Sequence, residues 1–271
     1  MTDGVPDPTE AATDDLAVRV RDDDLVVRAT IDRPEKRNAL NESVMRGLLD
    51  VAEAVDEGPA RVLVIEAAGG EVFSAGGDFT EMPIGGSAQQ FRETFSGLAI
   101  VMSALRETDA LTVAAVEGDC LAGGLGLAAA CEFIVAAESA EFATPEVGVG
   151  LFPVQAMVPI MRTVPEKRGL KLLFTGEHID AVEAYDMGLA TEVHPDDEFD
   201  AELDAFLDDL AASSPVMIGM GKEAYYQQAG LSFDEALGYA KEVIALMAMS
   251  EDTEEGIEAQ LMDRKPEWAG R

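Results

Sequence analysis

Hydrophobic positions along the chain follow two recurring patterns, which predict alternating strands and helices between residues 16 and 196. Short apolar runs rich in β-branched residues are typical of strands, and longer segments with apolar residues on one face are typical of helices. The predicted strands are 16–20, 25–31, 61–66, 111–116, 133–136, 141–143 and 188–193. The predicted helices are 44–57, 91–106, 124–131, 152–164, 166–175 and 180–187. Strands that alternate with helices indicate an α/β core.

After residue 197 the pattern changes, and only amphipathic helices are predicted. Apolar residues such as Leu246, Met247 and Met249 exceed what one small helix needs for packing. They either close over the core or form a subunit interface, and we expect residues 197–271 to be a C-terminal helical region used in oligomerisation. At the other end, residues 1–15 are rich in Asp, Pro and Thr, which predicts a disordered acidic tail.

The charge of the chain restricts its partners. It holds 53 acidic and 19 basic residues, a net charge of −34, and the acidic residues are spread along its whole length. Such an excess indicates a solvated surface, and in its specific form a protein adapted to very high salt, where repulsion between carboxylates is screened within a few Å. Binding to nucleic acid needs clustered Lys and Arg, so neither nucleic acid nor an anionic membrane is an expected partner.

The expected compartment is the cytoplasm. The start of the chain is acidic and polar, unlike a signal peptide, and no apolar run reaches the length of a membrane span. The two cysteines, Cys120 and Cys131, lie in an apolar stretch and are expected to be buried thiols. His178 and His194 belong to no metal-binding spacing, so no metal site is expected.

Two glycine-rich turns are the candidate chemistry. The apolar strand 111–116 leads into a turn that contains Gly123, and a small-residue helix follows. A second stretch, residues 73–78, contains Gly77 after an apolar segment. A turn of this kind either packs tightly or directs a free N–H group at a ligand. Two converging N–H groups would hold a carbonyl oxygen that becomes anionic during a reaction.

Several stretches of the sequence resemble the motifs of the enoyl-CoA hydratase/isomerase (crotonase) family, in order and with family-like spacing. They are residues 31–41 (IDRPEKRNALN), 73–78 (FSAGGD), 116–124 (VEGDCLAGG), 144–146 (TPE), 173–177 with 181–189, and 255–257 with 264–266. The resemblance covers the chain from about residue 16 to its end. It implies a crotonase-like spiral of ββα repeats with a C-terminal helical region, packed as a homotrimer or as a hexamer made of two trimers.

The resemblance also implies an acyl-CoA substrate and a set of residues that bind it. The thioester carbonyl would accept hydrogen bonds from the N–H groups of Gly77 and Gly123, and no cofactor is implied, because coenzyme A is part of the substrate. The residues that would bind the CoA part are listed by role: Ala75 and Asp78 beside the adenine, Lys36 and Arg37 beside the phosphates, and Lys265 from a neighbouring helix. The alternative for Lys36 and Arg37 is an ion pair with an acidic residue.

The sequence departs from the hydratase pattern at one of two glutamates. Family hydratases carry one glutamate three residues after the oxyanion glycine, where this chain has Gly126, and a second in the Pro-Glu motif, where it has Glu146. Hydration needs an activated water and a proton donor, whereas moving a double bond needs one base. A single glutamate therefore favours an enoyl-CoA isomerase with Glu146 as the base.

Other functions stay open. One is an enoyl-CoA hydratase whose second acid–base group is Asp119 or a residue of the 79–90 loop. Another is an oligomer that binds CoA thioesters with little activity. A nucleic-acid-binding member of the family is opposed by the negative charge.

Overall fold

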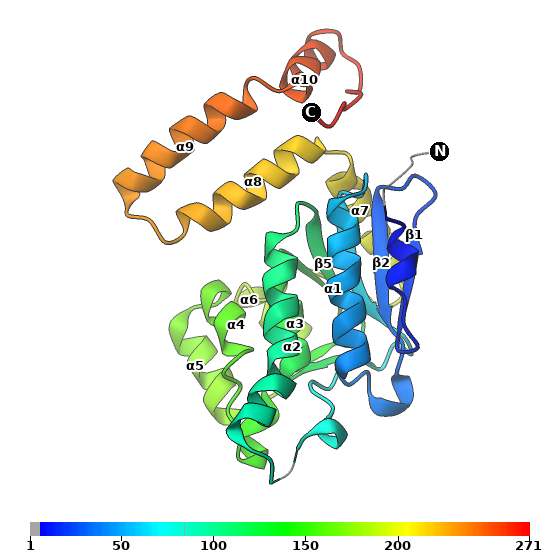
Figure 1. The fold of residues 1–271 in the computed structure, drawn as a ribbon, viewed down its shortest axis with the longest axis vertical. Coiled ribbons are helices and arrows are strands. Elements are labelled where there is room, and N and C mark those ends of the chain that lie inside the picture. The colour runs from blue at the N-terminus through cyan, green and yellow to red at the C-terminus, as the bar shows by residue number, and fades with distance from the viewer. Residues whose placement is uncertain (1–5, 84) are drawn as a thin grey trace.

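Two β-sheets form the centre of the protein (Figure 1). The computed structural model describes residues 6–83 and 85–271. The larger sheet has the order β1 (Leu16–Val20), β2 (Val26–Ile31), β3 (Val62–Ala67), β5 (Leu111–Val116), β7 (Phe133–Ala137) and β10 (Glu192–His194). The smaller has the order β4 (Val72–Ser74), β6 (Asp119–Leu121), β8 (Glu141–Ala143) and β9 (Ile179–Asp180). Pairing is parallel except between β1 and β2 and between β8 and β9.

The chain alternates between the sheets, which confirms the expected spiral of ββα repeats. Strands β3, β5 and β7 lie in the larger sheet, and the strand that follows each of them, β4, β6 or β8, lies in the smaller one. Helices α2 (Ala88–Glu107) and α3 (Gly123–Ala130) complete the first two repeats. Because β4, β6 and β8 are neighbours and parallel, the segments that follow them leave from the same edge of the smaller sheet.

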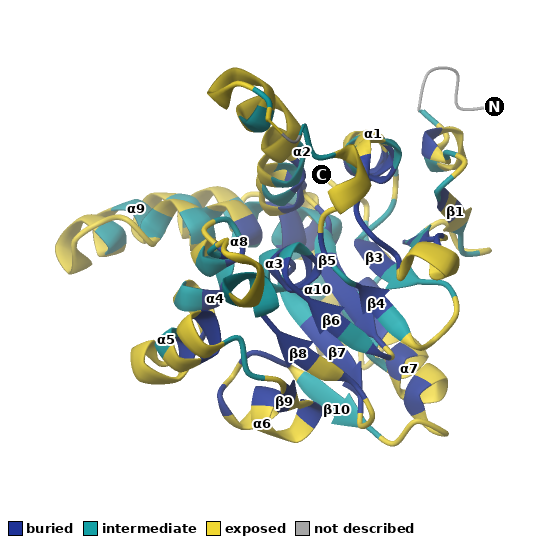
Figure 2. Cartoon of the chain, turned by 90° about the horizontal axis from the view of Figure 1, so that it is seen from below, coloured by how far each residue is buried: buried dark blue, intermediate teal, exposed yellow. Residues whose placement is uncertain are grey.

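Helices cover both faces of the larger sheet. Helix α1 (Glu42–Asp56) begins where the Asn41 side chain accepts a hydrogen bond from Val44 N, and it packs with α2 and α3 over one face. On the other face, α7 (Phe199–Ala211) buries Phe199, Leu203 and Leu207. The central strands are consequently buried on both sides, which explains their continuous apolar sequences (Figure 2). Although α7 lies within the expected C-terminal region, it packs on the core.

The remaining C-terminal helices extend away from the sheets. Helices α8 (Pro215–Gln228) and α9 (Phe233–Met247) form a hairpin that projects from the core, and α10 (Glu251–Leu261) follows at its base (Figure 1). Helix α9 buries no residue in this chain, and Phe233, Leu237 and Ile244 are exposed on it. This surface is apolar and lacks a partner within the described chain.

Several element boundaries differ from the sequence-based expectations. The other helices are α4 (Met157–Thr163), α5 (Glu166–Thr175), α6 (Ala181–Asp186) and the 3₁₀ helices η1 (Pro8–Ala11), η2 (Pro34–Lys36), η3 (Phe79–Glu81) and η4 (Pro145–Val149). Helix α4 begins later than expected, because residues 154–156 form a turn. Strand β10 also begins later, because Gly188 has a φ of +79° after α6 and the Leu189 N–H binds the Ala184 carbonyl.

Two expected loops contain more structure than their composition indicates. Within the expected tail 1–15, η1 buries Ala11 beside α1, and residues 1–5 lie outside the described part of the chain. Within the expected loop 79–90, η3 occupies residues 79–81 and a Ser87–Gln90 capping box starts α2, while Ile84 lies outside the described residues.

The expectation that both cysteines are buried is confirmed. Across residues 6–83 and 85–271, no helix combines the length and the apolar character needed to cross a membrane.

Candidate active site

The first glycine turn follows β4 and is fixed by the backbone of residues 37–40. The Leu40 N–H donates to the Gly76 carbonyl at 2.8 Å, and the Asp78 N–H donates to the Leu40 carbonyl at 3.0 Å. This parallel bridge leaves the N–H of Gly77 directed away from Leu40. Gly77 is exposed, so its N–H is accessible to a ligand.

The second glycine turn connects β6 to α3. Ala122 has a φ of 53° and a ψ of −127°, an unusual conformation for a residue with a side chain, and its N–H donates to the Ala143 carbonyl at 2.9 Å. Gly123 is the first residue of α3, so its N–H has no acceptor within the helix. The turn thus presents a backbone donor at the positive end of a helix.

The structure brings the two turns into contact. A Cβ built on Gly123 would lie 3.7 Å from the Gly77 nitrogen, and one built on Gly76 would lie 3.0 Å from the Gly123 nitrogen. Gly76 also has a φ of +93°, so this position requires glycine. Within the described residues, neither the Gly77 nor the Gly123 N–H donates to a protein acceptor. Two backbone donors are therefore free in one small region.

Glu146 lies in η4, directly after β8. Because β8 pairs with β6, η4 and the start of α3 leave the smaller sheet at the same edge. The Glu146 side chain is half-buried, and within the described residues its Oε2 atom is buried without a hydrogen-bond partner. Burial raises the pKa of this carboxyl group, because the charged form loses hydration. An unpaired carboxylate of this kind is suited to accept a proton.

Gly126, where hydratases carry their other glutamate, packs against another helix. A Cβ built at this position would lie 2.8 Å from the Cα and 2.9 Å from the Cβ of Ala156, at the start of α4. Position 126 therefore supplies no acid group and has no free space for one.

The Asp78 carboxylate is already engaged within the chain. It binds the Arg33 guanidinium at 3.0 Å and accepts the Thr80 N–H at 2.9 Å, and hydrogen bonds from Thr80 and Arg33 lower its pKa. Its side chain thus holds the turn beyond Gly77, and its N–H is used in the bridge to Leu40. The Ala75 N–H is likewise used, since it donates to the Arg37 carbonyl at 3.0 Å.

The three basic residues expected at CoA lie in two separate places: Lys36 and Arg37 are neighbours at the end of η2, and Lys265 follows α10. Arg37 is exposed and pairs with Asp119 at 3.0 Å, the ion pair considered as an alternative for it. Lys36 is exposed in η2. Lys265 is exposed and follows α10, a helix at the opposite end of the molecule from η3 (Figure 1). One copy of the chain does not bring Lys265 to the glycine turns.

Two residues that support the site were not predicted from the sequence. Asn38, buried with a φ of 51°, accepts the Arg33 N–H at 2.9 Å and donates to the carbonyls of Ala68 and Val72. Asn tolerates this left-handed conformation better than most residues, so an Asn in a polar loop was the available signal. The Ser74 hydroxyl accepts the Gly76 N–H at 3.2 Å.

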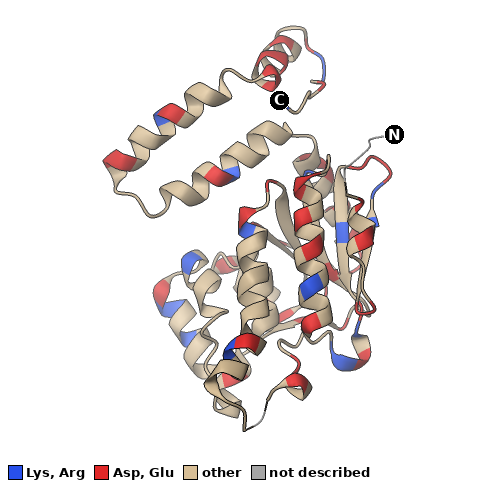
Figure 3. Cartoon of the chain, viewed as in Figure 1, with Lys and Arg blue, Asp and Glu red and all other residues tan. Residues whose placement is uncertain are grey.

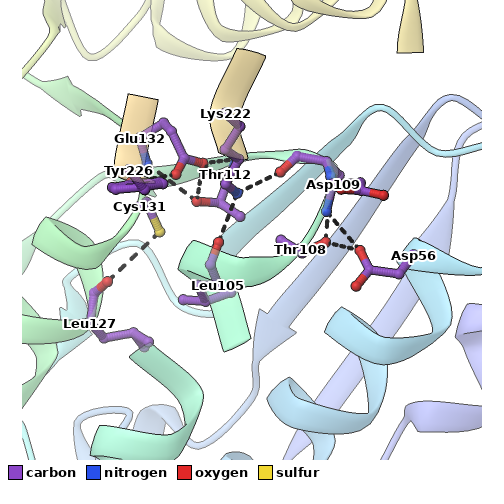
Figure 4. Close-up of polar contacts among 11 residues, drawn as sticks. Asp56, Leu105, Thr108, Asp109, Thr112, Leu127, Cys131, Glu132, Lys222 and Tyr226 are labelled. Carbon is purple, nitrogen blue, oxygen red and sulfur yellow. Dashed lines mark hydrogen bonds and ion pairs between the residues drawn. The ribbon is translucent and has the colours of Figure 1, made fainter. Parts of the chain in front are cut away.

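A second buried cluster lies where α8 meets the core (Figure 4). The Glu132 carboxylate accepts hydrogen bonds from Lys222 Nζ at 2.9 Å, Tyr226 Oη at 2.7 Å and the Thr112 N–H at 2.8 Å. Lys222 also donates to the carbonyls of Leu105 and Ala110. This cluster attaches the projecting helical hairpin to the sheet. Among residues 6–83 and 85–271, no group of His, Cys, Asp and Glu side chains is arranged to hold a metal ion.

Two sheets wound by ββα repeats place free amides and an unpaired carboxylate after neighbouring strands of the smaller sheet, an arrangement suited to stabilising an oxyanion. The model of one protein family, enoyl-CoA hydratase/isomerase, matches residues 22–271. The chain belongs to this family, whose members act on acyl-CoA thioesters.

Individual relatives and solved structures agree with this assignment. Human enoyl-CoA hydratase domain-containing protein 3, mitochondrial, is 34% identical over 88% of this chain and 79% of its own length. The 2,3-dehydroadipyl-CoA hydratase of Escherichia coli is 30% identical over 91% of this chain and 96% of its own. The crystal structure of a Mycobacterium smegmatis enoyl-CoA hydratase superposes with a TM-score of 0.89 at 30% identity, covering 94% of this chain and 99% of that one.

Proposed function

We propose that this protein isomerises enoyl-CoA, moving a double bond from the β,γ to the α,β position, with Glu146 as its single acid–base group. The observation that supports the proposal most directly is the buried, unpaired Oε2 of Glu146. Gly126 and its neighbour Ala156 leave no room for a second carboxylate. One carboxylate suffices for isomerisation, whereas hydration divides its proton transfers between two groups.

The proposed reaction has two proton transfers. The Glu146 carboxylate takes a proton from C2 of a 3-enoyl-CoA, and the electron pair of that C–H bond delocalises over the double bond and the thioester carbonyl. The resulting dienolate oxygen accepts hydrogen bonds from the N–H groups of Gly77 and Gly123, each worth about 10²–10³-fold in rate by analogy with other oxyanion sites. The Glu146 carboxyl group then returns the proton to C4, and the double bond lies between C2 and C3.

The CoA part would lie across the loop 36–40 and the turn 75–78. The adenine would contact the backbone of Ala75 and Asp78, and the phosphates would attract Lys36 and Arg37. Binding of a phosphate by Arg37 would compete with its ion pair to Asp119, which is exposed enough to exchange partners at little cost.

We also propose that the protein forms an oligomer in which neighbouring copies share the CoA site. The unpartnered apolar residues of α9 and α10, among them Leu237, Ile244 and Leu261, favour a homotrimer or a hexamer made of two trimers. In such an assembly, Lys265 of one copy would approach CoA bound by another. Light scattering that gives a monomer in molar salt would contradict this part of the proposal.

Hydration of a 2-enoyl-CoA is the second candidate, because several relatives are named as hydratases. It would need an atypical second group. Asp119, one group considered for this role, pairs with Arg37 at 3.0 Å, which weakens its case as an acid–base group.

The test presents the purified protein with a trans-3-enoyl-CoA and, separately, with crotonyl-CoA in molar salt. Formation of the conjugated thioester from the first without hydration of the second supports the isomerase. Rapid hydration of crotonyl-CoA favours the second candidate, and binding of CoA without either reaction indicates a thioester-binding protein with little activity.

We also propose that the protein is adapted to high salt. Acidic residues lie on most of the helices and in many of the loops, and basic residues are few (Figure 3). In dilute buffer the repulsion between these carboxylates is unscreened, so melting should move to lower temperature or the oligomer should dissociate. Unchanged melting and unchanged oligomeric mass between dilute buffer and molar KCl would contradict the proposal.

A further inference from the structure

A neighbouring segment closes the space in which a second acid group would stand. A Cβ at position 126 would lie within 3.0 Å of both the Cα and the Cβ of Ala156, closer than real Cβ contacts. Ala156 is 2% exposed, and Gly126 is also buried. Because one of the contacts is to a backbone atom, a change of rotamer does not relieve it, and even an alanine at position 126 requires the backbone to move.

The segment that carries Ala156, residues 151–156, is held from several sides, and we call it the closing segment. The Phe152 ring packs on an aromatic ring of α5 at a centroid distance of 4.8 Å. The Gln155 side chain donates to the Phe95 carbonyl of α2 at 2.8 Å. The closing segment therefore has fixed contacts to α2 and α5 in addition to its contact with α3.

The closing segment is also connected to the proposed base. The Leu151 N–H donates to the Glu146 carbonyl at 3.0 Å, so Glu146 and Ala156 are the two ends of one short, hydrogen-bonded stretch. A side chain at position 126 that pushes Ala156 outward would consequently disturb the backbone that carries Glu146.

We propose that Ala156 is a specificity-determining residue, because it holds the closing segment against Gly126 and thereby keeps the reaction dependent on Glu146 alone. The inference rests on the proposed isomerase function. It adds that the absence of a second carboxylate is built into the α3–α4 contact, so that replacing Gly126 alone does not create a hydratase.

The first test measures packing by thermal unfolding in molar salt. G126A should lower the melting temperature by about 2–10 °C, as expected for overpacking. The matched control is G221A, a helical position with open space around its Cβ, where alanine should leave melting unchanged or raise it. A156G removes one of the two clashing atoms. G126A should therefore lower the melting temperature less in the A156G background than in the wild-type protein.

The second test measures the reaction. G126E should lose isomerisation without gaining hydration of crotonyl-CoA, because the glutamate displaces the closing segment. The double variant G126E/A156G should raise the ratio of hydration to isomerisation at least about tenfold over that of the wild-type protein, consistent with the size of a general acid–base contribution.

Two outcomes would overturn the inference. One is a G126A variant as stable as G221A, with no coupling to A156G. The other is a G126E variant that folds with wild-type stability and hydrates crotonyl-CoA by itself. Failure of the proposed function has a different signature, since the wild-type protein would then fail to isomerise a 3-enoyl-CoA whatever the stability of the variants.

Discussion

Two glutamate side chains in this protein are partly buried, and they differ in whether their carboxylate oxygens accept hydrogen bonds. Both oxygens of Glu132 accept hydrogen bonds from protein donors, among them the Lys222 ammonium at 2.9 Å and the Tyr226 hydroxyl at 2.7 Å (Figure 4). Glu146 has a buried oxygen without any donor among the described residues, and burial raises its pKa.

The difference separates a structural carboxylate from a reactive one. Buried carboxylates are normally paired, so that the charge compensates for lost hydration, and Glu132 follows this rule. An unpaired carboxylate costs stability, and such groups are concentrated at functional sites. Glu132 is therefore expected to matter for folding and Glu146 for catalysis.

The largest expected effect is on turnover. E146Q should reduce isomerisation by about 10²–10⁴-fold, because glutamine has a similar shape but accepts no proton. Binding of CoA, followed by calorimetry, should be retained, since Glu146 is not among the residues proposed to contact CoA. E132Q, measured alongside, should alter turnover far less; a variant pair with the opposite order would reverse the assignment.

The next effect is on stability. K222M should lower the free energy of unfolding by about 3–5 kcal/mol, because it leaves the Glu132 carboxylate buried without its cation. Denaturant titration in molar salt measures the loss. The double variant K222M/E132Q should lose less than the sum of the two single variants, since the uncompensated charge is then absent. Simple additivity would show that Lys222 and Glu132 act independently.

The dependence of isomerisation on pH should report the surroundings of Glu146. The base must be ionised, so kcat/KM should fall about tenfold per pH unit as the pH drops below its pKa. Because burial raises that pKa above the ordinary value of 4.5, the acidic limb should lie above pH 4.5. An acidic limb of kcat/KM at or below pH 4.5 would mean that water reaches the Glu146 carboxylate and that burial does not raise its pKa.

The smallest effect is a gain of stability. When the pKa is higher in the native state than in the unfolded chain, native protein binds more protons between the two values, so stability falls as pH rises through this window. The E146Q variant has no carboxyl group at position 146, so it does not lose this stability as the pH rises. It should therefore melt above the wild-type protein at neutral pH, and the difference should shrink below about pH 4.5. E132Q should melt lower, and equal shifts in both variants would remove the distinction between the two glutamates.

The limits of several strands and helices could be predicted, because they depend on the local pattern of apolar and polar residues. Strands 111–116 and 141–143 and helix 166–175 have the expected limits, since apolar runs and helical faces are local signals. The proximity of Gly77 and Gly123 was implied by family motifs.

Other contacts between segments that are distant in the sequence could not be predicted. Tyr226 meets Glu132 across 94 residues, and nothing in the local sequence relates Gly126 to Ala156. The Arg33–Asp78 pair was missed for the same reason, and it gives the Asp78 side chain a part in supporting the glycine turn.

A crystal structure of the protein with an unreactive acyl-CoA thioester would show whether Gly77, Gly123 and Glu146 surround the reacting atoms. We expect the thioester oxygen at about 2.7–3.1 Å from the backbone nitrogens of both Gly77 and Gly123. The Glu146 carboxylate should face C2, with Ala156 still packed on Gly126. A thioester oxygen bound elsewhere, or a carboxylate other than Glu146 nearest to C2, would contradict the central claim.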